Sequence, residues 1–177
     1  YRPVDKRENF IKRCQGVGGD TLSVVNAQVF INGKAEPNPP ESELDYDYTT
    51  ADGNPINPDA LTDLNASTYE STHLFMTKGS ADKLKSISGV KSVTPRIALR
   101  GVTNPDAPVY PTNSQHPVGP PNLMLNGKQP DYKWNVDNYG PIIIPKKGWT
   151  VKLDSLTYPI YERCISVYEN NKLDVKG

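Results

Sequence analysis

One short segment near the start of the chain combines a lysine, apolar neighbours and a glycine-rich turn. It runs through Phe10-Ile11-Lys12-Arg13-Cys14 into Gln15-Gly16-Val17-Gly18-Gly19-Asp20. Aromatic and β-branched residues predict a strand over 8–14, and strand alternation places Phe10, Lys12 and Cys14 on one face. An amine between an aromatic ring and a thiol would be desolvated, which lowers its pKa from about 10.4 and makes it a candidate general base. An ordinary solvated strand lysine is the alternative.

Other side chains that could act as nucleophiles or metal ligands have no partner residue at the sequence spacing that such a site needs. Ser114 begins a Ser-Gln-His-Pro segment inside a proline-rich stretch, and neither His73 nor His116 has a neighbour at metal-ligand spacing. Three aspartates fail the spacing of a calcium loop, so a solvated acidic surface is the simpler interpretation: Asp45, Asp47 and Asp52. The sequence therefore predicts no metal site and no cofactor.

The two cysteines, Cys14 and Cys164, are far apart in the sequence and form no metal-binding pattern. One disulfide in an oxidising compartment remains open, although two buried free thiols are favoured. Ile160, Cys164 and Val167 fall on one stripe of a predicted helix, so we expect Cys164 to face the core.

Composition limits the class of protein. The 177 residues include 20 Lys plus Arg and 20 Asp plus Glu, and a chain with no net charge has no field to attract nucleic acid. No apolar run is long enough for a transmembrane helix. The 17 prolines argue against a helical bundle. Because the chain starts at Tyr1, we expect it to be a piece of a longer protein.

The character of the chain changes after residue 34. Before it, a hairpin is predicted over 21–25 and 28–32 through Asn26-Ala27, with a further turn at Asn32-Gly33. Residues 35–77 then contain nine acidic residues and no Lys or Arg. We predict strands over 68–77, 90–94, 97–99, 141–145 and 149–153, a helix over 81–88 with Ser80 as N-cap, a proline-rich loop over about 103–121, and a helix over about 158–169. The fold class expected is α+β with mostly antiparallel β structure.

The lysine segment and the hairpin after it resemble the lysine-bearing box of type I signal peptidases. In that family an aromatic-Ile-Lys-Arg strand runs into Gly-Leu-Pro-Gly-Asp, and a hairpin ending in Val-Asn-Gly-Lys follows. This chain keeps Lys12-Arg13, Gly16, Gly19-Asp20 and Asn32-Gly33-Lys34 in register, with Val17-Gly18 in place of Leu-Pro. Residues 138–148 and 159–165 also resemble members of the family, those of the bacterial variety with a long insertion.

The resemblance implies that a serine attacks the peptide bond after a signal sequence, with Lys12 as its general base. It implies that Phe10 and Ile11 border the clefts for the small side chains of an Ala-x-Ala-type cleavage site, with ordinary core packing as the alternative. Arg13 and Asp20 match positions with structural roles, Asp20 bracing the turn. The family's Ser-Met-x-Pro box and its downstream Gly-Asp-Asn and Ser/Asp/Arg box do not occur in this sequence, so we expect this chain alone to be inactive.

We therefore expect residues 1–34 to be a slice of a signal-peptidase-like catalytic core and residues 35–177 to be a large inserted or cap region carrying two helices. The parent would be a membrane-anchored serine endopeptidase of a bacterial inner membrane, with its catalytic region on the periplasmic, extracytoplasmic side and its anchor in a segment absent here. Its partners would be the signal peptides of exported preproteins.

Two alternatives from other classes remain open. One is a non-catalytic extracytoplasmic relative that keeps the fold and binds extended peptides, favoured if the full gene lacks the serine. The other is an unrelated secreted binding module whose Ile-Lys-Arg strand matches by chance. A core slice that lacks a neighbouring strand also favours a homodimer or strand exchange between two copies.

Overall fold

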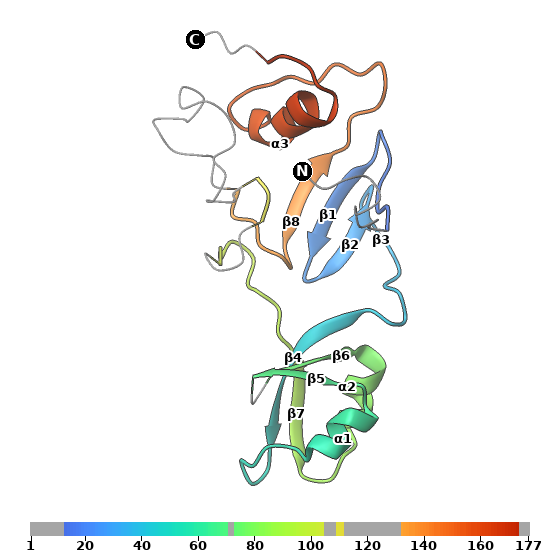
Figure 1. Ribbon diagram of the computed structural model, residues 1–177, viewed down its shortest axis with the longest axis vertical. Helices are drawn as coiled ribbons and strands as arrows, with labels where there is room; N and C mark the ends of the chain where they lie inside the picture. Colours follow the sequence, from blue (N-terminus) through green and yellow to red (C-terminus); the bar gives the residue numbers. More distant parts are fainter. Residues whose placement is uncertain (1–12, 71–72, 105–108, 112–131, 174–177) are drawn as a thin grey trace, which may run out of the picture.

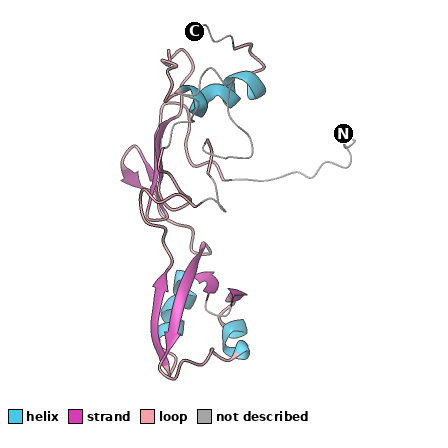
Figure 2. Ribbon diagram, turned by 90° about the vertical axis from the view of Figure 1, so that its left-hand side faces the viewer, coloured by secondary structure: helices cyan, strands magenta, loops and turns pink. Residues whose placement is uncertain are grey.

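A computed structural model describes residues 13–70, 73–104, 109–111 and 132–173. Within these ranges the chain forms two four-stranded antiparallel sheets, which lie toward opposite ends of an elongated molecule (Figures 1 and 2). Sheet A has the strand order β3-β2-β1-β8, and sheet B has the order β5-β6-β4-β7. This architecture agrees with the expected α+β class and its mostly antiparallel pairing.

Sheet A begins with the predicted hairpin. β1 (Thr21–Val25) pairs with β2 (Gln28–Ile31), and Val25 lies opposite Gln28. Asn26 and Ala27 have φ angles of 50° and 62°, as both central residues of a type I′ turn require. β3 (Lys34–Ala35) follows a second turn at Asn32-Gly33 and returns along β2. Both sequence-predicted turns are confirmed.

The fourth strand of sheet A comes from much later in the chain. β8 (Tyr139–Ile143) pairs with the other edge of β1, with Thr21 opposite Ile143. It begins two residues before the predicted strand over 141–145. The segments 97–99 and 149–153, which were also predicted as strands, are loops because neither finds a partner strand among the described residues. Sheet A therefore joins the opening hairpin to a segment from beyond residue 35, while the division of the chain at residue 34 stays a prediction.

Gly140 allows β8 to approach β1 closely. Its φ is 81°, and a Cβ added there would lie 2.8 Å from the Leu22 carbonyl oxygen. We expect Gly140→Ala to lower the free energy of unfolding by about 3 kcal/mol or more, because left-handed strain and a backbone clash add up. Gly53→Ala is the matched control, since Gly53 has a φ of 75° with no atom within 4 Å of its added Cβ, and strain alone should cost about 1–2 kcal/mol. Equal losses in urea titrations of the two variants would contradict the close-approach explanation.

Sheet B contains β4 (Glu43–Thr50), β5 (Ser67–Glu70), β6 (His73–Thr77) and β7 (Val90–Pro95). The single strand predicted over 68–77 is wrong, because β5 and β6 fold back on each other as a hairpin. One face of sheet B is buried against α1 (Pro58–Asp63) and α2 (Lys78–Lys85). The hydrophobic core lies between them and consists of Tyr46, Tyr48, Ile56, Leu61, Leu74, Met76, Ala81, Leu84 and Val93.

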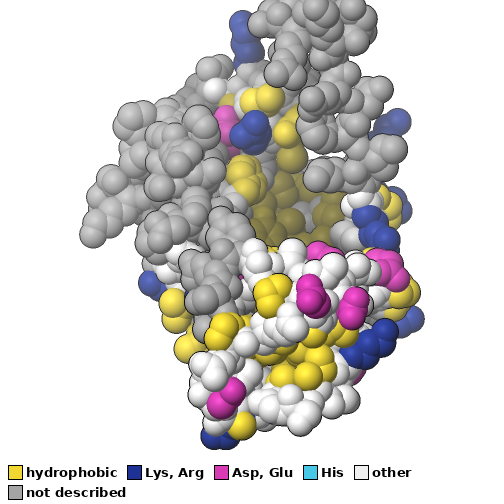
Figure 3. Space-filling model, turned by 60° about the horizontal axis from the view of Figure 1, so that its bottom comes forward, with side chains coloured by type: hydrophobic (Ala, Val, Ile, Leu, Met, Phe, Trp, Pro, Cys, Tyr) yellow, Lys and Arg dark blue, Asp and Glu magenta, His cyan; other side chains and the backbone are white. Residues whose placement is uncertain are grey.

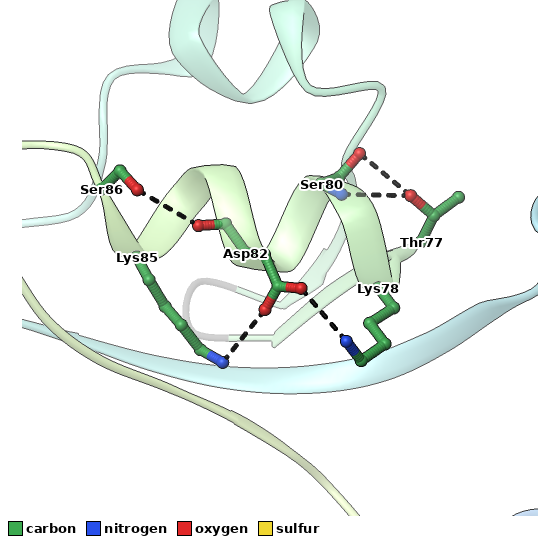
Figure 4. Close-up of polar contacts among 6 residues, drawn as sticks. All are labelled: Thr77, Lys78, Ser80, Asp82, Lys85 and Ser86. Atoms are coloured by element: carbon green, nitrogen blue, oxygen red, sulfur yellow. Dashed lines mark hydrogen bonds and ion pairs between the residues drawn. The ribbon is translucent and has the colours of Figure 1, made fainter.

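The capping of α2 differs from the sequence prediction. The helix starts at Lys78, and the Thr77 hydroxyl, rather than that of Ser80, accepts the capping hydrogen bond, from the Ser80 amide at 3.1 Å (Figure 4). The Ser80 hydroxyl instead donates to the Leu64 carbonyl at 2.7 Å, which ties α2 to the end of α1. On the exposed side, Asp82 bridges Lys78 and Lys85 (Figure 4).

The last described helix is α3 (Tyr158–Arg163), which continues into a π-helical turn, η3 (Cys164–Tyr168). The predicted helix over about 158–169 is thus confirmed in extent, but Cys164 is exposed rather than facing the core. The other two residues of the predicted stripe are not buried either, since Ile160 is half-buried and Val167 is 61% exposed, so no core covers this helix face in the described part of the chain. Cys14 is exposed as well, and the two thiols are free, so the expectation of burial was wrong.

The prediction of two helices in the region after residue 34 was also wrong. The described residues contain three α-helices, and α1 is the one that the sequence did not reveal. No helix in the described part of the chain is both long and apolar enough to span a membrane.

Candidate functional site

The residues predicted to do chemistry lie at the start of the chain. Phe10, Ile11 and Lys12 fall outside the described residues, so their predicted roles in catalysis and substrate contact stay predictions. Arg13 is described and is exposed in a loop segment. The geometry on this side of the molecule therefore starts with the glycine-rich turn over 16–20.

Asp20 closes that turn and joins it to the hairpin. Its carboxylate accepts hydrogen bonds from the Val17 amide at 2.9 Å and from the Asn32 side-chain amide at 2.8 Å. Asn32 in turn accepts from the amide of Thr21 at 2.9 Å. The bonds from Val17 and Asn32 hold the pKa of Asp20 below its usual value, because both stabilise the ionised carboxylate.

The end of β8 fixes the turn from its other side. The Gly19 amide donates to the Ile144 carbonyl at 2.8 Å, and the Ile144 amide donates to the Asp20 carbonyl at 2.8 Å. A Cβ on Gly16 would lie 2.6 Å from Cδ1 of Ile144, and one on Gly18 would lie 3.0 Å from the Pro145 carbonyl oxygen. The segment that follows Arg13 is thus held against both the hairpin and the end of β8, and its glycines permit the approach.

Removing the Asp20 carboxylate should give a pH-dependent loss of stability. We expect Asp20→Ala to lower the urea midpoint at pH 7 and the difference from wild type to shrink in acid. The pKa of Asp20 is depressed in the folded state, so its contribution is complete above the unfolded value of about 3.9 and disappears as the pH falls through the folded value. Urea titrations between pH 7 and pH 2 provide the measurement, and a difference that is independent of pH would contradict this role.

A small cavity of about 250 Å³ lies beside β1 and β8, and its lining includes Arg100, Trp134 and Tyr139. Tyr132 stacks on Trp134 with ring centroids 4.5 Å apart, and Trp134 contacts Tyr139 at 4.7 Å. Burial raises the pKa of Tyr132 to about 12 and also raises that of Tyr139, so both phenols stay protonated at neutral pH. Protonated phenols cannot act as bases, and this cluster packs the segment after residue 131 onto sheet A.

A larger groove of about 740 Å³ lies between the open face of sheet B and two segments that cover it in part. Its lining residues come from β4, β6 and the segments 96–104 and 136–137: Glu43, Leu44, Asp45, His73, Phe75, Arg96, Ile97, Ala98, Asn104, Val136 and Asp137. Sequence reasoning treated Asp45 and Asp47 as solvated acidic surface and missed this groove. The signal was the alternation of acidic and apolar residues in Glu43-Leu-Asp-Tyr-Asp-Tyr48, which is typical of a strand with one buried face.

The surface around sheet B carries both signs of charge. Figure 3 looks at this end of the molecule, where acidic, basic and hydrophobic side chains are all visible on the surface. No group of three or more His, Cys, Asp or Glu residues in the described ranges is arranged to hold a metal ion.

Residues 1–85 match a protein-family model described as signal peptidase, peptidase S26. The matched range includes Lys12, the glycine-rich turn and the hairpin, and it extends through α2 of the sheet B region. Comparisons with curated proteins and with solved structures gave no match. The family match supports a relationship of this chain to the signal peptidases, a family of membrane-anchored serine peptidases.

Proposed function

We propose that this chain is part of a signal-peptidase-like serine endopeptidase in which Lys12 is the general base. The observation that carries the proposal is the family match over residues 1–85, which includes the Lys12-Arg13 pair and the Gly19-Asp20 turn. The turn supports it further, because its contacts with Asn32 and Ile144 fix the path of the chain directly after the lysine segment.

The nucleophilic serine would come from a part of the parent protein that precedes this chain. A neutral Lys12 amine removes the serine hydroxyl proton as the oxygen attacks the peptide carbonyl, and the resulting ammonium returns a proton to the leaving amine. Water then hydrolyses the acyl-enzyme with the same lysine as base. This chemistry needs no metal or cofactor, but it needs an amine with a pKa well below about 10.4.

The substrates in this proposal are exported preproteins. Phe10 and Ile11 would border the clefts for small side chains at an Ala-x-Ala-type site and offer backbone groups to the extended peptide. The parent would be anchored in the inner membrane of a bacterium and act on its periplasmic side, where signal sequences emerge.

Cleavage of a preprotein by the full-length protein tests this function. We expect the N-terminus of the product to map to the residue after Ala-x-Ala, and replacement of the last Ala by Phe to abolish cleavage. Residues 1–177 alone should cleave neither substrate. If the full-length protein binds the preprotein but does not cleave it, the alternative of a non-catalytic extracytoplasmic peptide-binding domain is favoured instead.

A further inference from the structure

The floor of the groove on sheet B is the face of the sheet that points away from the hydrophobic core. In β4, Tyr46 and Tyr48 point into the core, so Asp45 lies on the opposite face. Phe75 lies directly across from Asp45 in β6, on the same open face, and is 39% exposed. A large aromatic side chain beside a carboxylate on an open sheet face provides both apolar contact and charge.

The wall of the groove is fixed by hydrogen bonds rather than left as a loose loop. The Ala98 amide donates to Asp137 at 2.8 Å, and the Asn138 side chain donates to the Ala98 carbonyl at 2.8 Å. At the near end the Arg96 amide donates to the Asp45 carbonyl at 2.8 Å. The groove is therefore a preformed feature, which lowers the entropic cost of binding.

The carboxylate of Asp45 has no donor within hydrogen-bonding distance of its Oδ1 atom. Its Oδ1 atom is buried without a partner, while Oδ2 lies 3.8 Å from Nη1 of Arg96, beyond hydrogen-bonding distance. Oδ1 is closed off from solvent, so a ligand in the groove meets this carboxylate through the exposed part of the side chain, which keeps 25% of its surface accessible. His73, on β6, faces Asp47 and Arg96 instead, with its Nε2 3.4 Å from Oδ1 of Asp47 and 3.1 Å from Nη1 of Arg96.

The charges that line the groove are unbalanced. Three carboxylates, those of Glu43, Asp45 and Asp137, stand against one guanidinium, that of Arg96. The apolar part of the lining consists of Leu44, Phe75, Ile97, Ala98 and Val136. This combination complements a cationic side chain flanked by apolar ones.

We propose that the groove over Asp45 and Phe75 binds an extended peptide segment in which a lysine or arginine lies next to bulky apolar residues. The cationic group pairs with the exposed part of the Asp45 carboxylate, and the apolar neighbours pack on Phe75 and Val136. The volume of about 740 Å³ lies within the usual range for ligand pockets and has room for a few side chains. β4 is an inner strand of sheet B, paired on both sides, so the peptide is recognised through its side chains and not by strand addition. The groove is outside the catalytic segment, and this inference does not rest on the proposed peptidase activity.

Fluorescence anisotropy with labelled peptides and the full chain tests the proposal. The probe is Gly-Ala-Phe-Lys-Val-Ala-Gly, with versions that carry Gln or Glu in place of Lys. We expect the Lys peptide to bind about tenfold more tightly than the Gln peptide and the Glu peptide to bind more weakly still, because a charge-assisted hydrogen bond is replaced and then opposed. Equal binding of the three peptides would overturn the proposal.

Two variants assign the binding to the groove. Asp45→Asn keeps the shape of the side chain and should weaken the Lys peptide about tenfold, whereas Asp63→Asn removes the same charge from the exposed end of α1 and should leave binding unchanged. Phe75→Ala should weaken all three peptides; the side chain is partly exposed and lies outside the core, and urea titration checks that the variant is folded. Unchanged affinity in both Asp45→Asn and Phe75→Ala would place the peptide elsewhere and refute the inference. These titrations measure peptide binding and not cleavage, so their outcome is independent of whether the peptidase proposal holds.

Discussion

Replacing Lys12 by methionine in the full-length protein is expected to lower kcat/KM for preprotein cleavage by about 10²–10⁴-fold. Methionine retains an unbranched apolar side chain of similar length but has no amine to accept the serine proton, and general-base catalysis contributes rate factors of that size. Initial rates with an Ala-x-Ala preprotein give the measurement. The loss should appear in kcat, because the substrate clefts are formed by other residues.

Lys91→Met is the matched control for this experiment. Lys91 is an exposed residue of β7 in sheet B, and its loss removes the same charge away from the proposed catalytic segment. We expect its activity to stay within about twofold of wild type, as is usual for a surface substitution. If Lys12→Met kept activity close to that of Lys91→Met, Lys12 would not be the general base.

The second large effect is expected at Asn135, which is only 2% exposed. Its Nδ2 donates to the carbonyls of Leu99 and Val102 at 2.9 and 2.8 Å. Its Oδ1 accepts from the amides of Asp137 and Asn138 at 3.1 and 2.8 Å. This one side chain therefore joins the segment after sheet B to the segment that leads into β8.

Asn135→Ala should lower the free energy of unfolding by about 3–5 kcal/mol, because it removes four hydrogen bonds made by a side chain that is itself almost fully buried. Urea titration followed by tryptophan fluorescence gives the measurement. Asn38→Ala, at an exposed loop position, is the matched control and should change stability by less than about 0.5 kcal/mol. A loss below about 1 kcal/mol for Asn135→Ala would show that the two segments are held together by other contacts.

Local sequence patterns predicted the parts of the fold that local chemistry decides. The turns at Asn26-Ala27 and Asn32-Gly33 use residues that tolerate positive φ, and both form where expected. The helix α2 was found because helix formers precede Gly89, although its cap moved to Thr77 when Ser80 bonded to Leu64 instead. Such capping depends on tertiary contacts, which the local sequence does not contain.

The missed elements have identifiable causes. α1 is only six residues long and lies among prolines and acidic residues, which hides its helical pattern. The one signal that could have predicted it is the Asn57 cap followed by Pro58 at the first helical position. β4 alternates Asp with Leu and Tyr, and its acidic residues were interpreted as a solvated surface rather than as the open face of a strand. The pairing of β8 with β1 is a long-range choice, and no local pattern specifies it.

Of the two candidate sites, the lysine segment was predicted from the sequence and the groove on sheet B was not. The lysine segment was found by resemblance to a family whose model matches residues 1–85. The groove on sheet B was missed because Asp45, Phe75 and Arg96 come together only when β4, β6 and the chain after β7 are assembled. These residues are far apart in the sequence, so an inspection of short segments does not bring them together. Each segment by itself has the mixed charge of an ordinary protein surface.

The protonation state of Lys12 is the most direct test of the peptidase account. Trace acetylation of the full-length protein between pH 5 and pH 11, with mass spectrometry of the Lys12 peptide and free Nα-acetyl-lysine as internal standard, measures the pKa of this amine. The account predicts that Lys12 is half-deprotonated several pH units below the standard value of about 10.4, since a general base must be neutral at the working pH. A Lys12 amine that titrates together with the free standard would be a solvated surface lysine and would contradict the proposed function.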